Sequence, residues 1–345
     1  MKSRRTLLAA SVIALGGLAA AACSSSSSSS TPTASSSSTA ASSGSSVNLS
    51  SVTLNVGDQK GTGAEAVLKA AGLLSTLPFK VSWSDFTSGP PMLEAMASGS
   101  VDVGGVGDAP PVFAAAGGEQ VEIVGARSVP SGDQDALVVP KGSSITSIQQ
   151  LKGKKIAYGS GSSANYHLLT VLNKAGLTTK DVTLVSLQPA NALAAFTSGA
   201  VDAWDIWPPY VQQVVAQDGA KVLAIGSQYG SPYSFEVASK AAVANAEKAA
   251  AIKVYLATLN KAYVFTATHP DVWGAAWGAA SGLPASITTE AAKVDATTPV
   301  TITSAVISSE QNLVSQFYKA GLIPNNVDMS GFITSEFNSS VAESG

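Results

Sequence analysis

The feature that most constrains the fold is a structural unit that occurs twice in the chain. Residues 88–102 read "SGPPMLEAMASGSVD", in which Gly-Pro-Pro begins a predicted helix, Ser-Gly ends it and Val-Asp begins a strand. Residues 190–202 read "ANALAAFTSGAVD" and repeat the same helix end and strand start. Two copies of one helix-to-strand corner predict a protein with two similar halves.

The repeated unit begins further upstream in each half. Residues 52–73 and 154–177 each read as a strand, a glycine-rich loop and a helix that ends in "AGL". Gly72 and Gly176 occupy the position after the helix, where the backbone needs a positive φ. Each half therefore runs strand, loop, helix, strand, loop, helix, strand.

Strands that alternate with helices predict parallel sheets with right-handed crossovers, one sheet in each half. Ligands bind outside the carboxyl ends of such strands. The loops that leave the strands at this edge are rich in Gly, Pro, Ser, Asn and Asp. We therefore predict an α/β fold with two lobes that close over a ligand in the cleft between them.

The lobe boundaries follow from two extended segments that cross between the halves. Residues 135–145 leave the first half and residues 233–241 return to it. The helical tail after the return is expected to pack on the first lobe. The predicted lobe 1 comprises 48–139 and 233–345 with the C-terminal helices, and lobe 2 comprises 140–232.

The N-terminal residues predict export. Basic residues precede an apolar run that is too short to span a membrane, which is typical of a signal peptide over residues 1–22. Cys23 follows directly, as at a bacterial lipoprotein cleavage site, so we expect a lipid on it. Residues 23–47 then form a Ser-rich flexible tether. Cleavage near Ala22 to a freely secreted protein is the alternative, and the Sec and Tat export routes both stay open.

Composition excludes several classes of function. Hydrophobic residues make up 45% of the chain, so a sizeable core is available, and the net charge of −3 argues against a nucleic-acid partner. Cys23 is the single cysteine, which excludes a disulfide, a cysteine nucleophile and a cysteine metal site in the fold. With two histidines in the chain we expect no histidine-based metal site and no cofactor.

Three segments carry a resemblance to a known family. They are "VSWSDFTSGPPMLEAMASGSVDVGGVGDAPPVFAAA", "LKGKKIAYGSGSSANYHLL" and "ALAAFTSGAVDAWDIWPPY". Together they resemble the aliphatic sulfonate, taurine and nitrate branch of the substrate-binding proteins of ABC importers. The resemblance implies a type II periplasmic-binding-protein fold with two crossover strands. It also implies delivery of a small anionic organic ligand to permease subunits, by a monomer on the outer face of the cell membrane.

The loops that begin helices are the candidate anion site. Helix N-termini present free N–H groups and a partial positive charge, which favour an oxyanion such as a sulfonate. Glycine lets a ligand approach the backbone closely, and proline fits the first helical turn. The candidate contacts in these loops are Gln59, Ser88, Gly89 and Pro90 in the first half, and Gly161, Ser162, Ser163 and Asn165 in the second.

Arg127 is the only arginine after Arg5, and it ends an apolar strand at the ligand edge. One interpretation is a bidentate grip on an oxyanion. The other is a surface arginine that pairs with Asp133 or Asp135. Asp108 likewise has two interpretations, as the N-cap of the helix that follows it or as a ligand contact.

The segment "DAWDIW" supplies the remaining candidates. Asp205 either binds a ligand ammonium group, as in taurine, or faces solvent. Trp204 and Trp207 either wall the pocket against an organic tail or belong to the core. Asp102 and Asp202 follow helix ends in matched places and are interpreted as turn residues.

The resemblance implies an extracytoplasmic solute-binding lipoprotein that delivers an organosulfonate of the taurine or alkanesulfonate type and catalyses nothing. Alternatives stay open: the same fold binding nitrate, a pyrimidine precursor or another small anion, or serving as a ligand sensor. An enzyme on this fold is disfavoured because the fold contains no cysteine nucleophile.

Overall fold

The structure is a computed structural model that describes residues 47–59 and 63–343. Residues 46–345 group into one compact unit. The predicted signal peptide, the lipidated Cys23 and nearly all of the tether lie outside the described residues. Among the residues that are described, none of the helices has the length and apolar character needed to cross a membrane.

The first sheet has six strands in the order β11-β4-β10-β3-β1-β2. β1 pairs in parallel with β2 and β3, whereas β10 runs antiparallel to β3 and β4. The side chains of Leu54 and Val56 on β1 are fully buried, as expected for a central strand covered on its faces. The strand bounds are β1 Thr53–Gln59, β2 Lys80–Phe86, β3 Val103–Val106, β4 Val121–Ser128, β10 Tyr233–Ser239 and β11 Thr298–Val300.

The second sheet has five strands in the order β7-β6-β8-β5-β9 and repeats the arrangement of the first. β6 pairs in parallel with β7 and β8, and β5 runs antiparallel to β8 and β9. The predicted α/β fold with two lobes is therefore confirmed. The strand bounds are β5 Ala136–Val139, β6 Lys155–Tyr158, β7 Thr183–Ser186, β8 Ala203–Ile206 and β9 Lys221–Ile225.

The first crossing between the lobes comes earlier than predicted. β5 pairs through Ala136 with Ile206 of β8 and Ile225 of β9, so it belongs to the second sheet. Lobe 1 therefore ends before Ala136, and the predicted boundary at residue 139 is too late. The return crossing agrees with the prediction, because β10 begins at Tyr233 in the first sheet.

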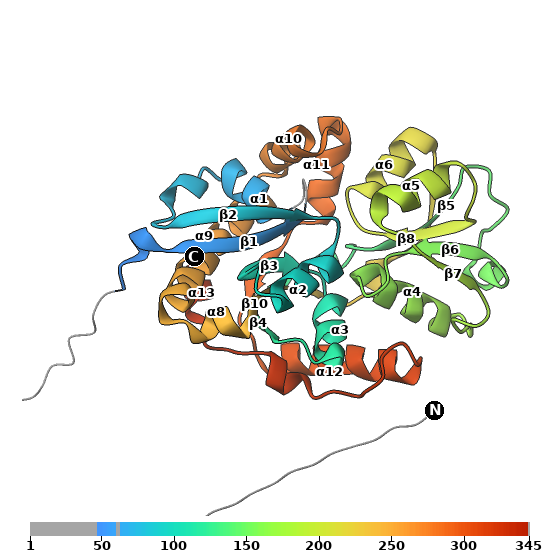
Figure 1. The fold of residues 1–345 in the computed structure, drawn as a ribbon. Helices are drawn as coiled ribbons and strands as arrows, with labels where there is room; N and C mark the ends of the chain where they lie inside the picture. Colours follow the sequence, from blue (N-terminus) through green and yellow to red (C-terminus); the bar gives the residue numbers. More distant parts are fainter. Residues whose placement is uncertain (1–46, 60–62, 344–345) are drawn as a thin grey trace, which may run out of the picture. The chain divides into compact units, whose positions relative to one another are not determined.

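The helices cover both sheets, and the C-terminal ones gather around the first (Figure 1). α11 also packs against α6 of the second lobe, so the tail contacts both lobes rather than lobe 1 alone. The helices are α1 Ala64–Ala70, α2 Gly89–Ala97, α3 Ala109–Gly117, α4 Ser163–Lys174, α5 Pro189–Thr197, α6 Tyr210–Asp218, α7 Gly226–Tyr229, α8 Lys240–Ala244, α9 Ala246–Thr268, α10 Pro270–Ser281, α11 Ala285–Val294, α12 Ser304–Lys319 and α13 Ser339–Ala342.

The repeated corner has the same hydrogen bonds in both lobes. The N–H of Asn55, in β1, donates to Asp102 Oδ2 at 2.9 Å, and the N–H of Lys155, in β6, donates to Asp202 Oδ2 at 2.8 Å. Both aspartates are turn residues that fix the start of a neighbouring strand, as predicted. Gly72 and Gly176 have φ of 71° and 74°, which confirms their place after the helix ends.

Candidate ligand-binding site

A cavity of about 120 Å³ lies at the carboxyl ends of the strands of both sheets. This is the edge at which the topology predicts a ligand. The volume is well below the roughly 300–1,000 Å³ of pockets for drug-sized molecules, so the cavity suits a compact ligand. Of the residues predicted for the site, those that line it are Gln59, Gly89, Arg127, Ser162, Ser163 and Trp207.

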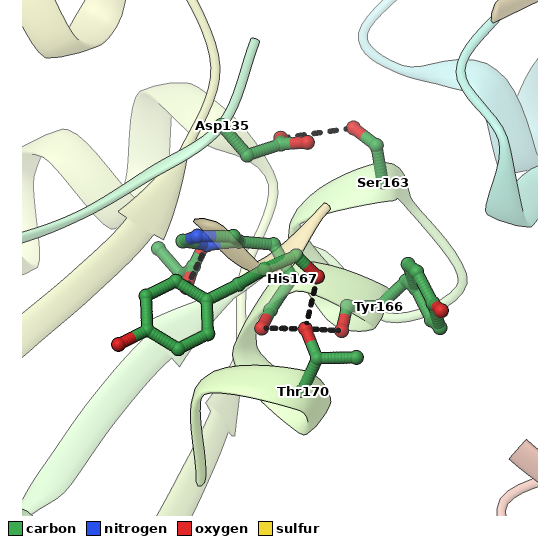
Figure 2. Close-up of polar contacts among 7 residues, drawn as sticks. Asp135, Ser163, Tyr166, His167 and Thr170 are labelled. Carbon is green, nitrogen blue, oxygen red and sulfur yellow. Dashed lines mark hydrogen bonds and ion pairs between the residues drawn. The ribbon is translucent and has the colours of Figure 1, made fainter. Parts of the chain in front are cut away.

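Lobe 2 contributes the N-terminus of α4 to the cavity. Ser162 precedes the helix, but its hydroxyl donates to the carbonyl of Gly159 at 2.7 Å and does not cap α4. The Ser163 hydroxyl donates to Asp135 Oδ1 at 3.0 Å (Figure 2). α4 therefore begins at the cavity without a side-chain cap, which is the arrangement that binds anions.

Lobe 1 contributes Gly89, the first residue of α2, which also has no side-chain cap. Pro90 and Pro91 follow and have no N–H, so Gly89 supplies the one N–H donor among the first three residues of this helix. Ser88 instead donates its hydroxyl to Gln188 Oε1 at 3.0 Å, and Thr87 donates to the same oxygen at 2.8 Å. Since Gln188 precedes α5 in lobe 2, these two bonds tie the lobes together at the rim of the site. Ser88 is buried by this contact and does not line the cavity.

Glycines allow the lobes to approach closely at the cavity. A Cβ atom on Gly107 of lobe 1 would lie 2.9 Å from Cβ of Ser163 in lobe 2. A Cβ on Gly161 would lie 3.4 Å from Pro90, so Pro90 and Gly161 face each other across the lobes. Pro90 and Gly161 were both predicted as ligand contacts, but neither is among the residues that line the cavity.

Arg127 is buried in lobe 1, with 9% of the residue exposed. Its guanidinium pairs with Glu236 of β10 and lies 4.3 Å from the centre of the Tyr263 ring. The interpretation as a surface arginine paired with Asp133 or Asp135 is therefore wrong. Arg127 does line the cavity, and its Nε has no hydrogen-bond partner among the described residues.

Two cavity carboxylates were missed by the sequence analysis. Asp58 is the residue before the last in β1 and accepts hydrogen bonds from the N–H groups of Gln59 at 2.9 Å and Glu65 at 3.0 Å. Burial nevertheless raises the pKa of Asp58 to about 7. Any side chain at Gly63 would overlap Asp58. The signal for Asp58 was its place in the first ligand loop, directly before Gln59.

Asp295 is the second missed carboxylate, and it follows α11 near the end of the chain. It lines the cavity together with Gln134 and Tyr263. Burial raises the pKa of Asp295 to about 6, against the opposing charge of Arg127. No motif marks this position in the sequence, since the tail reaches the cavity through its packing alone.

Asp205 does not line the cavity, and the expectation that it faces solvent is wrong. Asp205 is 0% exposed. Its Oδ2 atom lies 2.9 Å from Nδ1 of His167 on α4, with which it forms an ion pair. β8 is the central strand of its sheet and α4 and α5 cover its two faces, so a residue on either face is buried. Burial opposes a charge on His167, but the Asp205 carboxylate outweighs it and raises the pKa of His167 to about 9.

Trp204 is a core residue rather than a pocket wall. It is 0% exposed and packs against Phe196 at 5.9 Å and Tyr210 at 5.7 Å between ring centres. It points to the opposite face of β8 from Asp205, as alternation along a strand requires. Trp207, beyond the end of the strand, does reach the cavity.

The remaining predicted residues hold loops in place. Asp108 accepts a 2.7 Å hydrogen bond from the N–H of Ala109, which confirms the N-cap interpretation. Asn165 Oδ1 accepts from the N–H of Gly161 at 3.0 Å and closes the loop before α4. Both side chains are buried and neither lines the cavity.

Comparison with known proteins agrees with this geometry. Residues 88–272 match the family described as NMT1/THI5 like. The chain is 36% identical over 286 residues to a putative aliphatic sulfonates-binding protein of Escherichia coli K12, covering 81% of this chain and 88% of that protein.

Two solved structures share the fold. One is the alkanesulfonate-binding protein SsuA of Xanthomonas axonopodis pv. citri bound to MOPS, with 32% identity, a TM-score of 0.76 and coverage of 83% of this chain and 99% of that one. The other is the periplasmic aliphatic sulphonate binding protein SsuA of Escherichia coli, with 35% identity, a TM-score of 0.72 and coverage of 82% and 92%. The chain thus belongs to the NMT1/THI5-like family, in the group of aliphatic sulfonate-binding proteins that its motifs predicted.

Proposed function

We propose that this protein is an extracytoplasmic solute-binding protein that delivers an organosulfonate to an ABC importer. The observation that carries the proposal is a small cavity between two lobes that is lined by the uncapped N-terminus of α4, at Ser162 and Ser163, and by Gly89 at the start of α2. Such N-termini bind an oxyanion through neutral donors. The names of the relatives, aliphatic sulfonate-binding and taurine-binding periplasmic proteins, support the same ligand class.

The sulfonate would lie between the N-termini of α2 and α4, near Gly89 and Ser163. Trp207 and Pro208 line the same cavity and would cover the organic stem of the ligand. A sulfonate is ionised at all physiological pH values, so a site of neutral backbone N–H donors needs no proton to bind it. Binding and release, without covalent chemistry, is then the whole task of the protein.

An enzymatic role has little support. The fold is shared with the desulfurization enzyme DszB at 16% identity and a TM-score of 0.61, which is a likeness of fold alone. The single cysteine of this chain is Cys23, before the tether. The proposed location is the outer face of the cell membrane, through a lipid on Cys23, with permease subunits as partners.

Calorimetric titration of the purified protein with taurine, propane-1-sulfonate, nitrate and sulfate tests the ligand class. We expect one-to-one binding of at least one sulfonate and none of sulfate. Binding of nitrate with no response to either sulfonate would overturn the proposal in favour of another anion.

A pair of variants tests the position of the sulfonate. Ser163 is the first residue of α4, where proline fits a helix but removes the N–H donor. Ser163→Ala keeps that N–H and removes only the hydroxyl. We expect Ser163→Pro to weaken sulfonate binding at least tenfold more than Ser163→Ala. Equal affinities in the two variants would place the sulfonate elsewhere.

A further inference from the structure

Ser163 lines the cavity, but its hydroxyl is bonded to a carboxyl group that does not. Ser163 Oγ lies 3.0 Å from Asp135 Oδ1, and the two side chains point toward one another (Figure 2). Asp135 itself is buried, with 6% of the residue exposed, and is not among the residues that line the cavity. A buried carboxyl group thus contacts a hydroxyl of the proposed ligand site from behind.

The direction of this hydrogen bond depends on the protonation state of Asp135. An ionised carboxylate can only accept, so the Ser163 hydroxyl must donate to it and presents only lone pairs to the cavity. A protonated carboxyl group can instead donate its O–H to Ser163 Oγ, at the same distance between the two oxygens. The Ser163 hydroxyl is then free to donate to an anion in the cavity.

The surroundings of Asp135 bring its protonation close to neutral pH. Burial raises the pKa of Asp135 to about 7. The charge of His167 on α4 opposes this shift, whereas the charges of Asp205 on β8 and Asp295 after α11 add to it. Burial and the charge of Asp135 in turn raise the pKa of Asp108, at the start of α3. Asp135 therefore gains or loses its proton near neutral pH.

Other charged residues on the neighbouring elements have different partners or face water. Asp133, two residues earlier in the chain, accepts the N–H of Ser227 at 3.2 Å. Lys174, near the end of α4, is exposed and donates to the carbonyl of Gln228. Lys221 on β9 is exposed. The environment of Asp135 is therefore set mainly by burial and by the acids and the histidine already named.

Support of the helix alone does not explain the bond to Ser163. A carboxylate that capped α4 would accept N–H groups of its first turn. Asp135 instead accepts the hydroxyl, and α4 has no side-chain cap. The backbone of Asp135 is fixed to lobe 2 independently, because its carbonyl accepts the N–H of Gly226 at 2.8 Å. The side chain is therefore available to orient Ser163.

We propose that Asp135 is a positioning residue whose protonation turns the Ser163 hydroxyl into a hydrogen-bond donor for the bound sulfonate. This inference rests on the proposed function, in which the sulfonate lies at the N-terminus of α4. Backbone N–H groups bind the anion at every pH, and the hydroxyl adds to them only when Asp135 holds a proton. Because the pKa of Asp135 is about 7, the added affinity is present below pH 7 and is lost as the pH rises through that value.

Two acids that line the cavity would also make sulfonate binding depend on pH. Burial raises the pKa of Asp58 to about 7 and that of Asp295 to about 6. Their ionisation repels any bound anion, whether or not residue 163 has a hydroxyl. The ratio of wild-type affinity to Ser163→Ala affinity cancels this shared effect and isolates the contribution of the hydroxyl.

The test measures this ratio by calorimetry at pH 5.5 and pH 8, with taurine or propane-1-sulfonate, whichever the wild type binds more tightly. At pH 5.5 the wild type should bind about tenfold more tightly than Ser163→Ala, because the variant lacks one hydrogen bond to a charged group. At pH 8 the difference should shrink to about twofold or less, since few Asp135 side chains then hold a proton.

Asp135→Asn imitates the protonated state, since its amide N–H can donate to Ser163 Oγ at any pH. In this background, adding Ser163→Ala should weaken binding about tenfold at both pH values. The amide has nearly the shape of the carboxyl group and leaves the backbone bond to Gly226 in place. Asp218→Asn, an exposed change in α6, is the matched control and should reproduce the wild type at both pH values.

The outcomes separate this inference from the proposed function. If the ratio of wild-type to Ser163→Ala affinity is the same at both pH values, the inference is overturned and the proposed function stands. If the ratio still changes with pH in the Asp135→Asn background, another group controls Ser163 and the inference is overturned as well. If neither sulfonate binds the wild type at either pH, both proposals fail together.

Discussion

The two lobes bring opposite kinds of chemistry to the cavity they share. Lobe 1 exposes charged groups to it, namely Asp58 and Arg127, and the C-terminal tail adds Asp295. Lobe 2 lines it with Ser162, Ser163 and Trp207, which are neutral. One charged pair of lobe 2, His167 and Asp205, is fully buried and does not line the cavity.

The sequence repeat therefore gives both lobes the same arrangement of strands and helices, whereas the residues that line the cavity differ between the lobes. The corners at Asp102 and Asp202 make the same hydrogen bond to the start of a strand. The loops after the first strands differ, as "GDQKGTG" in one lobe and "GSGSS" in the other. The two lobes therefore share their backbone arrangement but line the cavity with side chains of different charge.

The largest expected effect on stability comes from breaking the buried ion pair of lobe 2, between His167 and Asp205. Asp205→Ala leaves His167 buried without its counter-ion, so we expect the free energy of unfolding to fall by ~3–5 kcal/mol. Urea denaturation measures the loss. Asp218→Ala, on the surface of the same lobe, should change it by less than ~0.5 kcal/mol. A loss below ~1 kcal/mol for Asp205→Ala would mean that His167 is neutral in the folded protein.

The same pair predicts how stability depends on pH. The folded-state pKa of His167, about 9, lies above the usual 6.5, so its stabilisation is fully present below pH 6.5 and is lost as the pH rises through 9. We expect the free energy of unfolding to fall by on the order of 2–3 kcal/mol over that window. The double variant His167→Gln/Asp205→Asn should lose most of this fall. An unchanged fall would assign it to other buried acids whose pKa burial raises well above the usual range, such as Asp108 and Glu310.

A smaller effect, on sulfonate affinity, is expected from a substitution at Gly107, where the two lobes touch. Gly107→Ala places a Cβ 2.9 Å from Cβ of Ser163, so the closed position of the lobes must shift. We expect sulfonate affinity to drop about tenfold, or ~1.4 kcal/mol, with little change in the urea midpoint. Gly117→Ala, whose Cβ would meet nothing closer than 3.9 Å, is the control. Equal affinity in both variants would show that ligand binding tolerates lobe separation at this point.

The order of strands and helices was predictable because short sequence patterns mark where each helix ends and each strand begins. Helix-ending glycines such as Gly72 and Gly176 mark the corners by their own backbone conformation, and the repeat places the two aspartates in matched positions even though each bonds to a strand 47 residues earlier. Arg127 was not predictable in the same way, because its partner Glu236 arrives on β10 after the chain has built the whole of lobe 2. Asp205 was misjudged because a strand covered on both faces buries every side chain, polar ones included.

The smallest expected effect sharpens the comparison of the two corners. Asp102 also contacts Nζ of Lys248 on α9 at 2.6 Å, whereas Asp202 makes no ion pair with any described residue. Asparagine keeps an acceptor for the strand N–H, so Asp102→Asn should cost ~1 kcal/mol and Asp202→Asn ~0.5 kcal/mol or less. In a double-mutant cycle, adding Lys248→Met to Asp102→Asn should cost little more, because the ion pair is already lost. If the two asparagine variants lose equal stability, the contact with α9 contributes nothing, and the corners are equivalent in energy as well as in geometry.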